Sequence, residues 1–250
     1  HSHHISNYQI YSNCLAGIHS LANMGLADYK GIIGTAASTA SFILLLSPSI
    51  LCLKIWKNKS SKNVPFPPLM EAMARSILMF QQGLVMGVWP IVVTHSIGLL
   101  LNLCYLTIYL TFTKDKAEAQ KCMLRWSTIL VPVTAYVLYE DKSLLEARFA
   151  TIVTAVTISL MLYHLYAVKY VIASKSTKDL PLPIIVSALC VTFLWTLYGI
   201  AINKVALQIQ TGFAFCVCAF ELSLFAVYPS KPTSESEQKS GETSDSKKES

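Results

Sequence analysis

The chain has 250 residues, of which 53% are hydrophobic and only 14% are charged, and its formal net charge is +6. Soluble globular domains carry about 25% charged residues, so this composition excludes that class and indicates a protein that crosses a membrane several times. The basic residues lie between apolar runs and not along one face, which argues against a nucleic-acid partner. The seven cysteines lie mostly inside apolar runs and predict neither a disulfide framework nor a metal site.

Apolar runs follow one another along most of the chain. Residues 1–30 are mixed in character and predict an N-terminal segment outside the membrane, extracellular or lumenal. After Tyr228, residues 229–250 are rich in Ser, Glu and Lys and predict a disordered cytosolic tail, because they are too polar to bury a core. Since a helix needs ~20 apolar residues to cross the bilayer core, we predict seven transmembrane helices, over 31–53, 67–88, 90–112, 123–139, 148–172, 182–201 and 205–228.

The chain also contains an internal repeat. The segments Ser47-Pro48, Lys59-Ser60-Ser61-Lys62 and Gln82-Gly83 correspond, 116 residues later, to Tyr163-His164, Lys175-Ser176-Thr177-Lys178 and Tyr198-Gly199. A doubled pattern in an apolar chain is typical of transporters built from parallel repeats. The predicted fold is therefore an all-α integral membrane protein. Its linking helix 123–139 joins two parallel three-helix repeats, 31–112 and 148–228, in a 3+1+3 arrangement.

The distribution of lysine and arginine predicts the orientation in the membrane. The loops and the tail on one side carry fourteen of these residues, whereas the other side carries Lys30, Lys142, Arg148 and Lys204. Because cytosolic loops are enriched in positive charge, the N-terminus is expected outside and the C-terminus in the cytosol. We expect a multi-pass protein of the plasma membrane, with the Golgi or another endomembrane as the alternative.

The repeated motifs resemble those of the SWEET sugar transporters of the animal type. The signatures are Lys175-Ser176-Thr177, a proline that opens the second helix of each repeat, and Trp195-Thr196-Leu197-Tyr198-Gly199. The likeness covers about residues 31–229. It implies a carrier that moves mono- or disaccharides passively in both directions by alternating access, with a pocket at midmembrane between the repeats.

The resemblance also assigns roles to individual positions. In the family an asparagine from the third helix of each repeat lines the pocket, and here these positions hold His95 and Ile209. The stacking tryptophans of the second helices correspond to Met79 and Trp195. Because sugar hydroxyls need partners that donate and accept, Gln208 and Gln210 beside Ile209 are further candidates. The four gating prolines of the family correspond to Pro48, Pro68, His164 and Pro183.

Some polar residues allow a structural interpretation as well. His95 either lines the pocket or forms a hydrogen bond to a neighbouring helix, since ionisable groups within membrane helices usually face a cavity or a partner. His164 stands where the family has a gating proline, and there a structural role is favoured. Glu71 and Arg75 are four residues apart and can pair on one helix face. Because they lie outside the family's pocket positions, we expect Glu71 to extend to the cytosolic surface with Arg75 following it.

Several other functions are compatible with the same pattern of apolar runs. A relative of the PQ-loop type that acts as a cargo receptor or amino-acid exporter would share the architecture, and so would a subunit that carries nothing itself. A seven-helix receptor is disfavoured because it predicts no internal repeat. The sequence contains no catalytic constellation or phosphate-binding loop, so we predict no enzyme and no cofactor. The expected partners are a sugar, the lipid bilayer and further copies of the chain.

Overall fold

The structure is a computed structural model that describes residues 25–228 except 63, 176 and 178–181, and leaves the side chains of 163–167, 170 and 174 aside. Most of the predicted N-terminal segment and the whole predicted tail therefore lie outside the described residues. The described helices are α2 (Lys30–Leu45), α3 (Pro48–Asn58), α4 (Pro67–Met86), α5 (Trp89–Phe112), α6 (Lys116–Tyr139), α7 (Lys142–Ser174), α8 (Leu182–Ala201) and α9 (Val205–Val227).

The helices confirm the all-α membrane fold. Among the described residues, six stretches are long and apolar enough to cross a membrane, with α2 and α3 together forming the first. The second predicted span, α4, has a suitable length of 20 residues but carries Glu71, Arg75, Gln81 and Gln82. These polar residues make α4 less apolar than its neighbours, although it packs against three of them, α5, α6 and α7.

The first predicted span, 31–53, is two helices and not one. Pro48 has no N–H to donate and its ring would clash with the carbonyl four residues earlier, so α2 ends at Leu45 and α3 begins at Pro48. The turn between them is held by two hydrogen bonds between residues three apart in the chain, from Ser47 N to Leu44 O and from Ser49 N to Leu46 O. The span therefore bends at the proline and continues to Asn58, five residues beyond the prediction.

Two further predictions of helix boundaries are corrected at their start. Helix α6 begins at Lys116 instead of 123, because Asp115 caps it by accepting a hydrogen bond from Glu118 N (3.1 Å). Helix α7 begins at Lys142 instead of 148, after Asp141 in extended conformation. In both cases the polar first turns extend the helix past its apolar run, which the criterion of apolar length overlooks.

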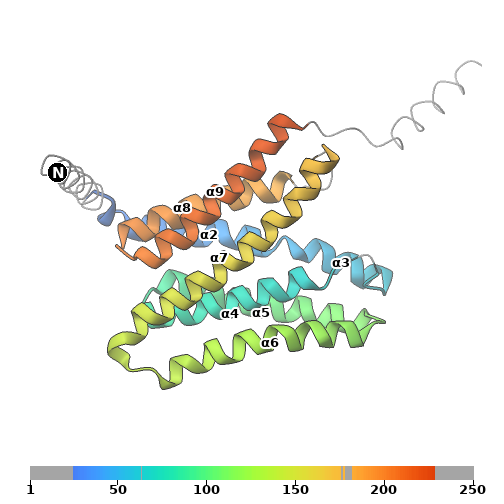
Figure 1. Cartoon of the computed structure of the whole chain (residues 1–250), viewed down its shortest axis with the longest axis horizontal. Coiled ribbons are helices and arrows are strands. Elements are labelled where there is room, and N and C mark those ends of the chain that lie inside the picture. Colours follow the sequence, from blue (N-terminus) through green and yellow to red (C-terminus); the bar gives the residue numbers. More distant parts are fainter. Residues whose placement is uncertain (1–24, 63, 176, 178–181, 229–250) are drawn as a thin grey trace, which may run out of the picture.

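The helices form two triplets that have the same packing order. In the first repeat α5 lies against α2, α3 and α4; in the second repeat α9 lies against α7 and α8. The linking helix α6 packs on α4 and, to a smaller extent, on α7 (Figure 1). The triplets meet where α2 contacts α8 and where α4 contacts α7. The third helix is thus central in each triplet.

Hydrophobic clusters join the two repeats at one end of the bundle. The α2–α8 cluster comprises Ala37, Met86, Val88, Ile91, Val191, Trp195, Tyr198 and Leu207. The α4–α7 cluster comprises Ala74, Leu78, Leu130, Phe149 and Val153. Both contain residues of the two repeats, and both lie toward the end where α5, α7 and α9 begin. We call the end that carries the lysine-rich loops the lysine-rich end. The end where α5, α7 and α9 begin is then called the opposite end.

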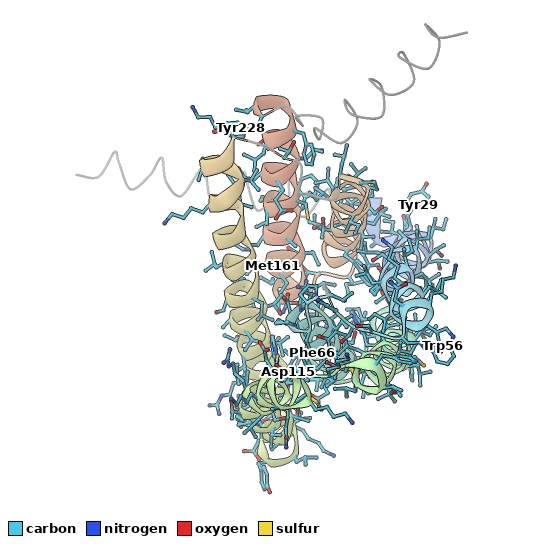
Figure 2. All side chains as sticks on the ribbon, turned by 90° about the vertical axis from the view of Figure 1, so that its right-hand side faces the viewer. Tyr29, Trp56, Phe66, Asp115, Met161 and Tyr228 are labelled. Carbon is cyan, nitrogen blue, oxygen red and sulfur yellow. The ribbon has the colours of Figure 1, made fainter. Side chains whose placement is uncertain are left out.

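At the lysine-rich end the clusters of the described residues remain within one half of the molecule. One cluster joins α3, α4 and α5 to the start of α6 and includes Ile55, Phe66 and Tyr109. The other comprises Val168, Val171 and Leu224 of the second repeat. Figure 2, which views this end, shows Tyr228 of the second repeat well apart from Phe66 and Asp115. The repeats are therefore joined at the opposite end and separate toward the lysine-rich end.

Candidate functional site

The closest contact between the repeats is that of α2 with α8. Trp195 is buried, and its Nε1 donates a hydrogen bond to Ser41 Oγ (2.8 Å). Ser41 Oγ in turn donates to Ala37 O (2.8 Å), so the hydroxyl is both acceptor and donor. Tyr198 packs edge-on against the Trp195 ring, with ring centroids 5.6 Å apart. Of the predicted stacking residues, Trp195 thus contacts the other repeat directly.

Glycine allows this contact. A Cβ at Gly34 of α2 would lie 2.8 Å from Tyr198 Cε2 and 3.3 Å from Pro90 Cγ. Real Cβ atoms do not approach other carbons so closely, so the ring of Tyr198 occupies the space that a side chain would need. The absence of a side chain at Gly34 therefore lets α2 and α8 approach each other at the opposite end.

Met79 lies near this contact, and His95 lies on another helix of the same repeat. Met79 of α4 is half-buried and packs against both the α2–α8 cluster and the α4–α7 cluster. His95 of α5 is half-buried, and its Nδ1 is buried without a hydrogen-bond partner among the described residues. The structure thus brings Met79 and Trp195 to one cluster, and places His95 on the adjoining helix α5.

Other polar atoms are buried without a partner in the described part of the chain. They belong to Gln81 and Gln82 of α4, Thr94 and His95 of α5, and Gln210 of α9. Gln82, Thr94 and Gln210 are at most 2% exposed. Buried polar groups are normally hydrogen-bonded, so such groups inside a membrane bundle favour a water molecule or a polar substrate as partner. All of them lie on the second or third helix of a repeat.

The three neighbouring residues predicted on α9 point in different directions. Gln208 Nε2 donates to Gly199 O (3.1 Å), which ties α9 to α8. Ile209 is 50% exposed, whereas Gln210 is buried and its Nε2 donates to Thr154 Oγ1 of α7 (2.7 Å). Gln210 therefore lies in the interior of the bundle, and Ile209 lies on its surface.

The predicted gating positions lie near helix breaks or starts, apart from His164. Pro48 produces the break between α2 and α3, and Pro68 and Pro183 lie exposed in the first turns of α4 and α8. A proline is tolerated in a first turn because the N–H groups there have no partner within the helix. His164 lies within α7, but its side chain is outside the described part.

The charged residues inside the bundle form a second group of interest. Arg75 Nη2 donates to Glu71 Oε1 (2.9 Å), as the spacing of four residues allows, and the side chain of Arg75 remains 37% exposed. The ion pair therefore lies along one face of α4 and leaves the guanidinium partly open to its surroundings.

Comparison with known proteins identifies the relatives of this architecture. The family model described as "Sugar efflux transporter for intercellular exchange" matches residues 31–117 and again residues 147–233. Each match covers one three-helix repeat, and together they cover more than half of the chain. The chain belongs to this family.

Individual relatives agree with this family assignment. The protein is 27% identical over 204 residues to "Sugar transporter SWEET1" of Drosophila pseudoobscura pseudoobscura, covering 79% of this chain and 89% of the relative. It is 26% identical over 215 residues to "Bidirectional sugar transporter SWEET7b" of Oryza sativa subsp. indica, covering 80% and 77%. A solved structure of a eukaryotic SWEET transporter shares the fold with a TM-score of 0.73 at 20% identity, covering 81% of this chain and 98% of the other.

Sequence reasoning missed several residues of the site in this family member. Ser41, Gln82 and Thr94 were not predicted, although each is a polar residue within an apolar run. Their polarity alone could have marked them, because polar groups in membrane helices need a partner. The helix face on which each lies, however, becomes certain only when the neighbouring helix is known.

Proposed function

We propose that this protein carries sugars passively across a membrane by alternating access between its two repeats. The single observation that carries the proposal is the asymmetry of their contacts. The Trp195–Ser41 hydrogen bond and the two shared clusters join the repeats at the opposite end. At the lysine-rich end, each cluster of the described residues stays within one half. Such an arrangement supports a carrier that is closed at one end and opens at the other by a rigid-body motion.

The proposed substrate is a neutral mono- or disaccharide. A sugar has apolar C–H faces that suit an aromatic ring, and hydroxyl groups that need both donors and acceptors. Trp195 would provide the ring, with Met79 beside it. His95, Gln82 and Gln210 would provide the polar partners, because each has a buried polar atom without one. Gln208, bonded to Gly199, would hold α8 and α9 together instead.

Uptake of labelled glucose, fructose, trehalose and sucrose by a host deficient in sugar uptake tests the transport itself. We expect at least one of the four sugars to be transported in both directions, as uptake and as efflux, without an ion gradient. A protein present at the cell surface that moves none of them would contradict the proposal. That result would favour a cargo receptor or a subunit that carries nothing itself.

Two neighbouring residues of α9 then test the site. Gln210→Leu removes a polar group from the interior and should lower uptake about tenfold, the effect of losing one hydrogen bond to a substrate. The matched change Ile209→Asn restores the family's residue at a position that is 50% exposed, and should leave uptake nearly unchanged. The reverse order of effects would assign the sugar to the Ile209 side of α9.

The remaining part of the proposal concerns the setting of the protein. We propose a plasma-membrane protein with its N-terminus outside and its lysine-rich end in the cytosol, since positively charged loops are retained there. Epitope tags at the two ends, probed before and after permeabilisation, test this orientation. We also propose a homo-oligomer, and a monodisperse monomer by light scattering in mild detergent would contradict it.

A further inference from the structure

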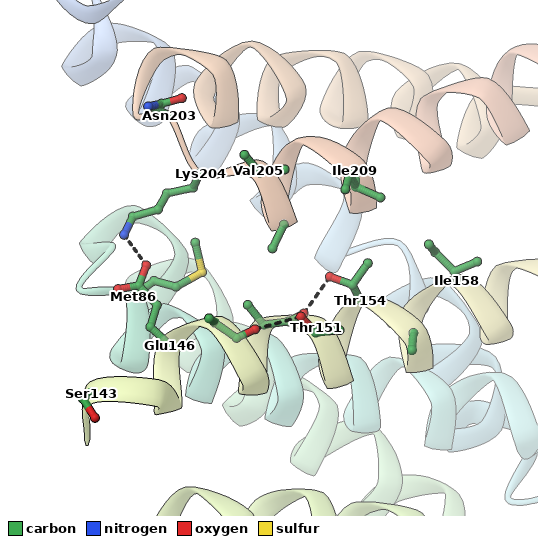
Figure 3. Close-up of a pocket in the computed structure, with 14 residues that line it drawn as sticks. Met86, Ser143, Glu146, Thr151, Thr154, Ile158, Asn203, Lys204, Val205 and Ile209 are labelled. Atoms are coloured by element: carbon green, nitrogen blue, oxygen red, sulfur yellow. Dashed lines mark hydrogen bonds and ion pairs between the residues drawn. The ribbon is translucent and has the colours of Figure 1, made fainter. Parts of the chain in front are cut away.

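A cavity of about 820 Å³ lies between α7 and α9 at the opposite end (Figure 3). Two side-chain bridges cross from one helix to the other at its borders. Lys204 forms an ion pair with Glu146 nearest the end of the bundle, and Gln210 Nε2 donates to Thr154 Oγ1 (2.7 Å) toward the middle. Met86 of α4 lines the cavity as well. Its size is within the range of about 300–1,000 Å³ that is usual for ligand sites.

Away from the end of the bundle, the walls of the cavity are apolar. They include the small side chains of Ala147, Ala150 and Ala206 and the larger ones of Ile158 and Ile209. The wall also contains Thr151, whose Oγ1 donates to Ala147 O (2.8 Å) and is thereby used within α7. A sugar would find few partners on such walls, whereas a hydrocarbon chain would bury apolar surface against them.

The cavity opens on the side of the bundle that faces away from the first repeat. Val205 and Ile209 line it and are 60% and 50% exposed. The same face of α9 continues with Phe220 and Val227, which are also exposed. Leu207, on the other side of the helix, is buried in the α2–α8 cluster. In a membrane this outward face of α9 meets the acyl chains of lipids.

The rim of the cavity at the end of the bundle is polar. It includes Ser143 and Asn203 besides the Lys204–Glu146 pair, whose side chains are 30% and 49% exposed. Helices α7 and α9 both begin here, and neither has a side-chain hydrogen bond at its N-cap. Free N–H groups at a helix start attract phosphate, and Lys204 adds a full positive charge beside them. The carboxylate of Glu146 complements an ammonium group.

We propose that this cavity binds a zwitterionic phospholipid of the phosphatidylethanolamine kind. Its phosphate lies beside Lys204 and the starts of the two helices, and its ammonium group lies beside Glu146. One acyl chain extends between α7 and α9 along the alanine wall. The pairing of a polar rim at the membrane surface with an apolar cavity at membrane depth selects an amphiphile. The presence of both charges on the rim selects a headgroup that carries both.

Native mass spectrometry of the full chain in detergent tests this proposal, after addition of phosphatidylethanolamine, phosphatidylglycerol or diacylglycerol with identical acyl chains. We expect the wild type to retain phosphatidylethanolamine best. The double change Ala147→Leu/Ala206→Leu fills the cavity and should lower its occupancy about tenfold. Lys204→Gln should lower it about fivefold, because one lysine near a phosphate contributes about 1 kcal/mol. Cys216→Leu, exposed and outside the cavity lining, is the matched control and should bind as the wild type does.

Each alternative outcome contradicts a definite part of the proposal. Equal retention by the filled and control variants would place the lipid elsewhere on the protein. Diacylglycerol bound as well as phosphatidylethanolamine would exclude the headgroup contacts, and preferred binding of phosphatidylglycerol would exclude the role of Glu146. If the double variant does not fold, the single change Ala147→Leu, at an exposed position, carries the same test. Lipid retention is measured without transport, so its outcome is independent of the sugar carried.

Discussion

The two repeats share one topology but differ in where the described polar contacts tie the third helix to its neighbours. In the first repeat, Tyr105 of α5 is hydrogen-bonded to Ser49 Oγ (2.7 Å) and donates to Leu45 O (3.2 Å). Tyr109 donates to Val64 O (3.2 Å), so these contacts lie toward the lysine-rich end. In the second repeat, Gln208 ties α9 to α8 and Gln210 ties α9 to α7 toward the opposite end.

This difference shows which end of each third helix is held by polar contacts. In the first repeat, Asn102, Tyr105 and Tyr109 bind α5 to α4, to the α2–α3 break and to the loop after α3. Buried hydrogen bonds of this kind fix helices more specifically than apolar packing alone. We infer that α5 stays fixed to its neighbours toward the lysine-rich end, and that α9 stays fixed to α8 and α7 toward the opposite end, where the repeats are joined.

The largest expected effect concerns the joint between the repeats. Trp195→Ala removes a buried ring and the hydrogen bond to Ser41, and should lower the free energy of unfolding by about 3–5 kcal/mol. Uptake should be lost, since the ring is also the proposed sugar platform. Trp195→Phe keeps most of the ring and serves as the control. Thermal unfolding and uptake are measured on the same preparations, and an uptake loss in both variants with intact stability in Trp195→Phe would implicate the indole N–H.

A smaller effect is expected from crowding the same joint. Gly34→Ala places a Cβ 2.8 Å from the Tyr198 ring, and should destabilise the closed opposite end by about 1–3 kcal/mol. Gly31→Ala is the matched control, because a Cβ there meets nothing within 4 Å and alanine favours the helix by about 1 kcal/mol. Accessibility of a cysteine introduced at the opposite end reports the opening. Equal accessibility in the two variants would mean that α2 and α8 adjust freely.

The comparison of the two repeats is sharpened by single hydroxyl deletions. Tyr105→Phe removes the hydroxyl bonded to Ser49 and Leu45, and should cost about 1–2 kcal/mol of stability. Thr211→Val in the second repeat removes a hydroxyl that is hydrogen-bonded to Thr196 Oγ1 (3.0 Å) and donates to Leu207 O within its own helix, and should cost less. Denaturation in detergent compares the two variants. A larger loss from Thr211→Val would mean that the threonine pair of the second repeat contributes more than the tyrosine hydroxyl of the first.

The smallest effect is expected at the junction of α6 and α7. The hydroxyl of Tyr136, together with the Arg148 guanidinium, holds the pKa of Glu140 below its ordinary value. A carboxyl with a lowered pKa stabilises the fold above its unfolded value of about 4.3 and loses this contribution as the pH falls through the lowered pKa. Glu140→Gln should therefore reduce the Tm slightly at pH 7, with no difference from the wild type in strong acid. A difference that persists in acid would exclude an ionic origin.

The sequence alone predicted most of the fold and part of the candidate site. Each of the seven predicted spans coincides with described helices, and six of these stretches are apolar enough to cross a membrane. The repeated Lys-Ser motif and Tyr198-Gly199 revealed the two repeats. The family resemblance predicted that Met79 and Trp195 both contact the substrate, and in the structure Met79 packs against the cluster that contains Trp195. The division at Pro48 and the early starts of α6 and α7 were missed, since apolar length does not register a local break or a polar first turn.

The amino-acid sequence by itself determined that the chain crosses a membrane as two related triplets, because apolar length and repetition are properties of the chain alone. Only the tertiary structure decided which polar side chains point inward. Gln208, Ile209 and Gln210 are adjacent in the sequence, yet one joins α8, one lies on the surface and one is buried. The physical reason is that successive residues of a helix differ by about 100° in direction, so their surroundings depend on where the neighbouring helices lie.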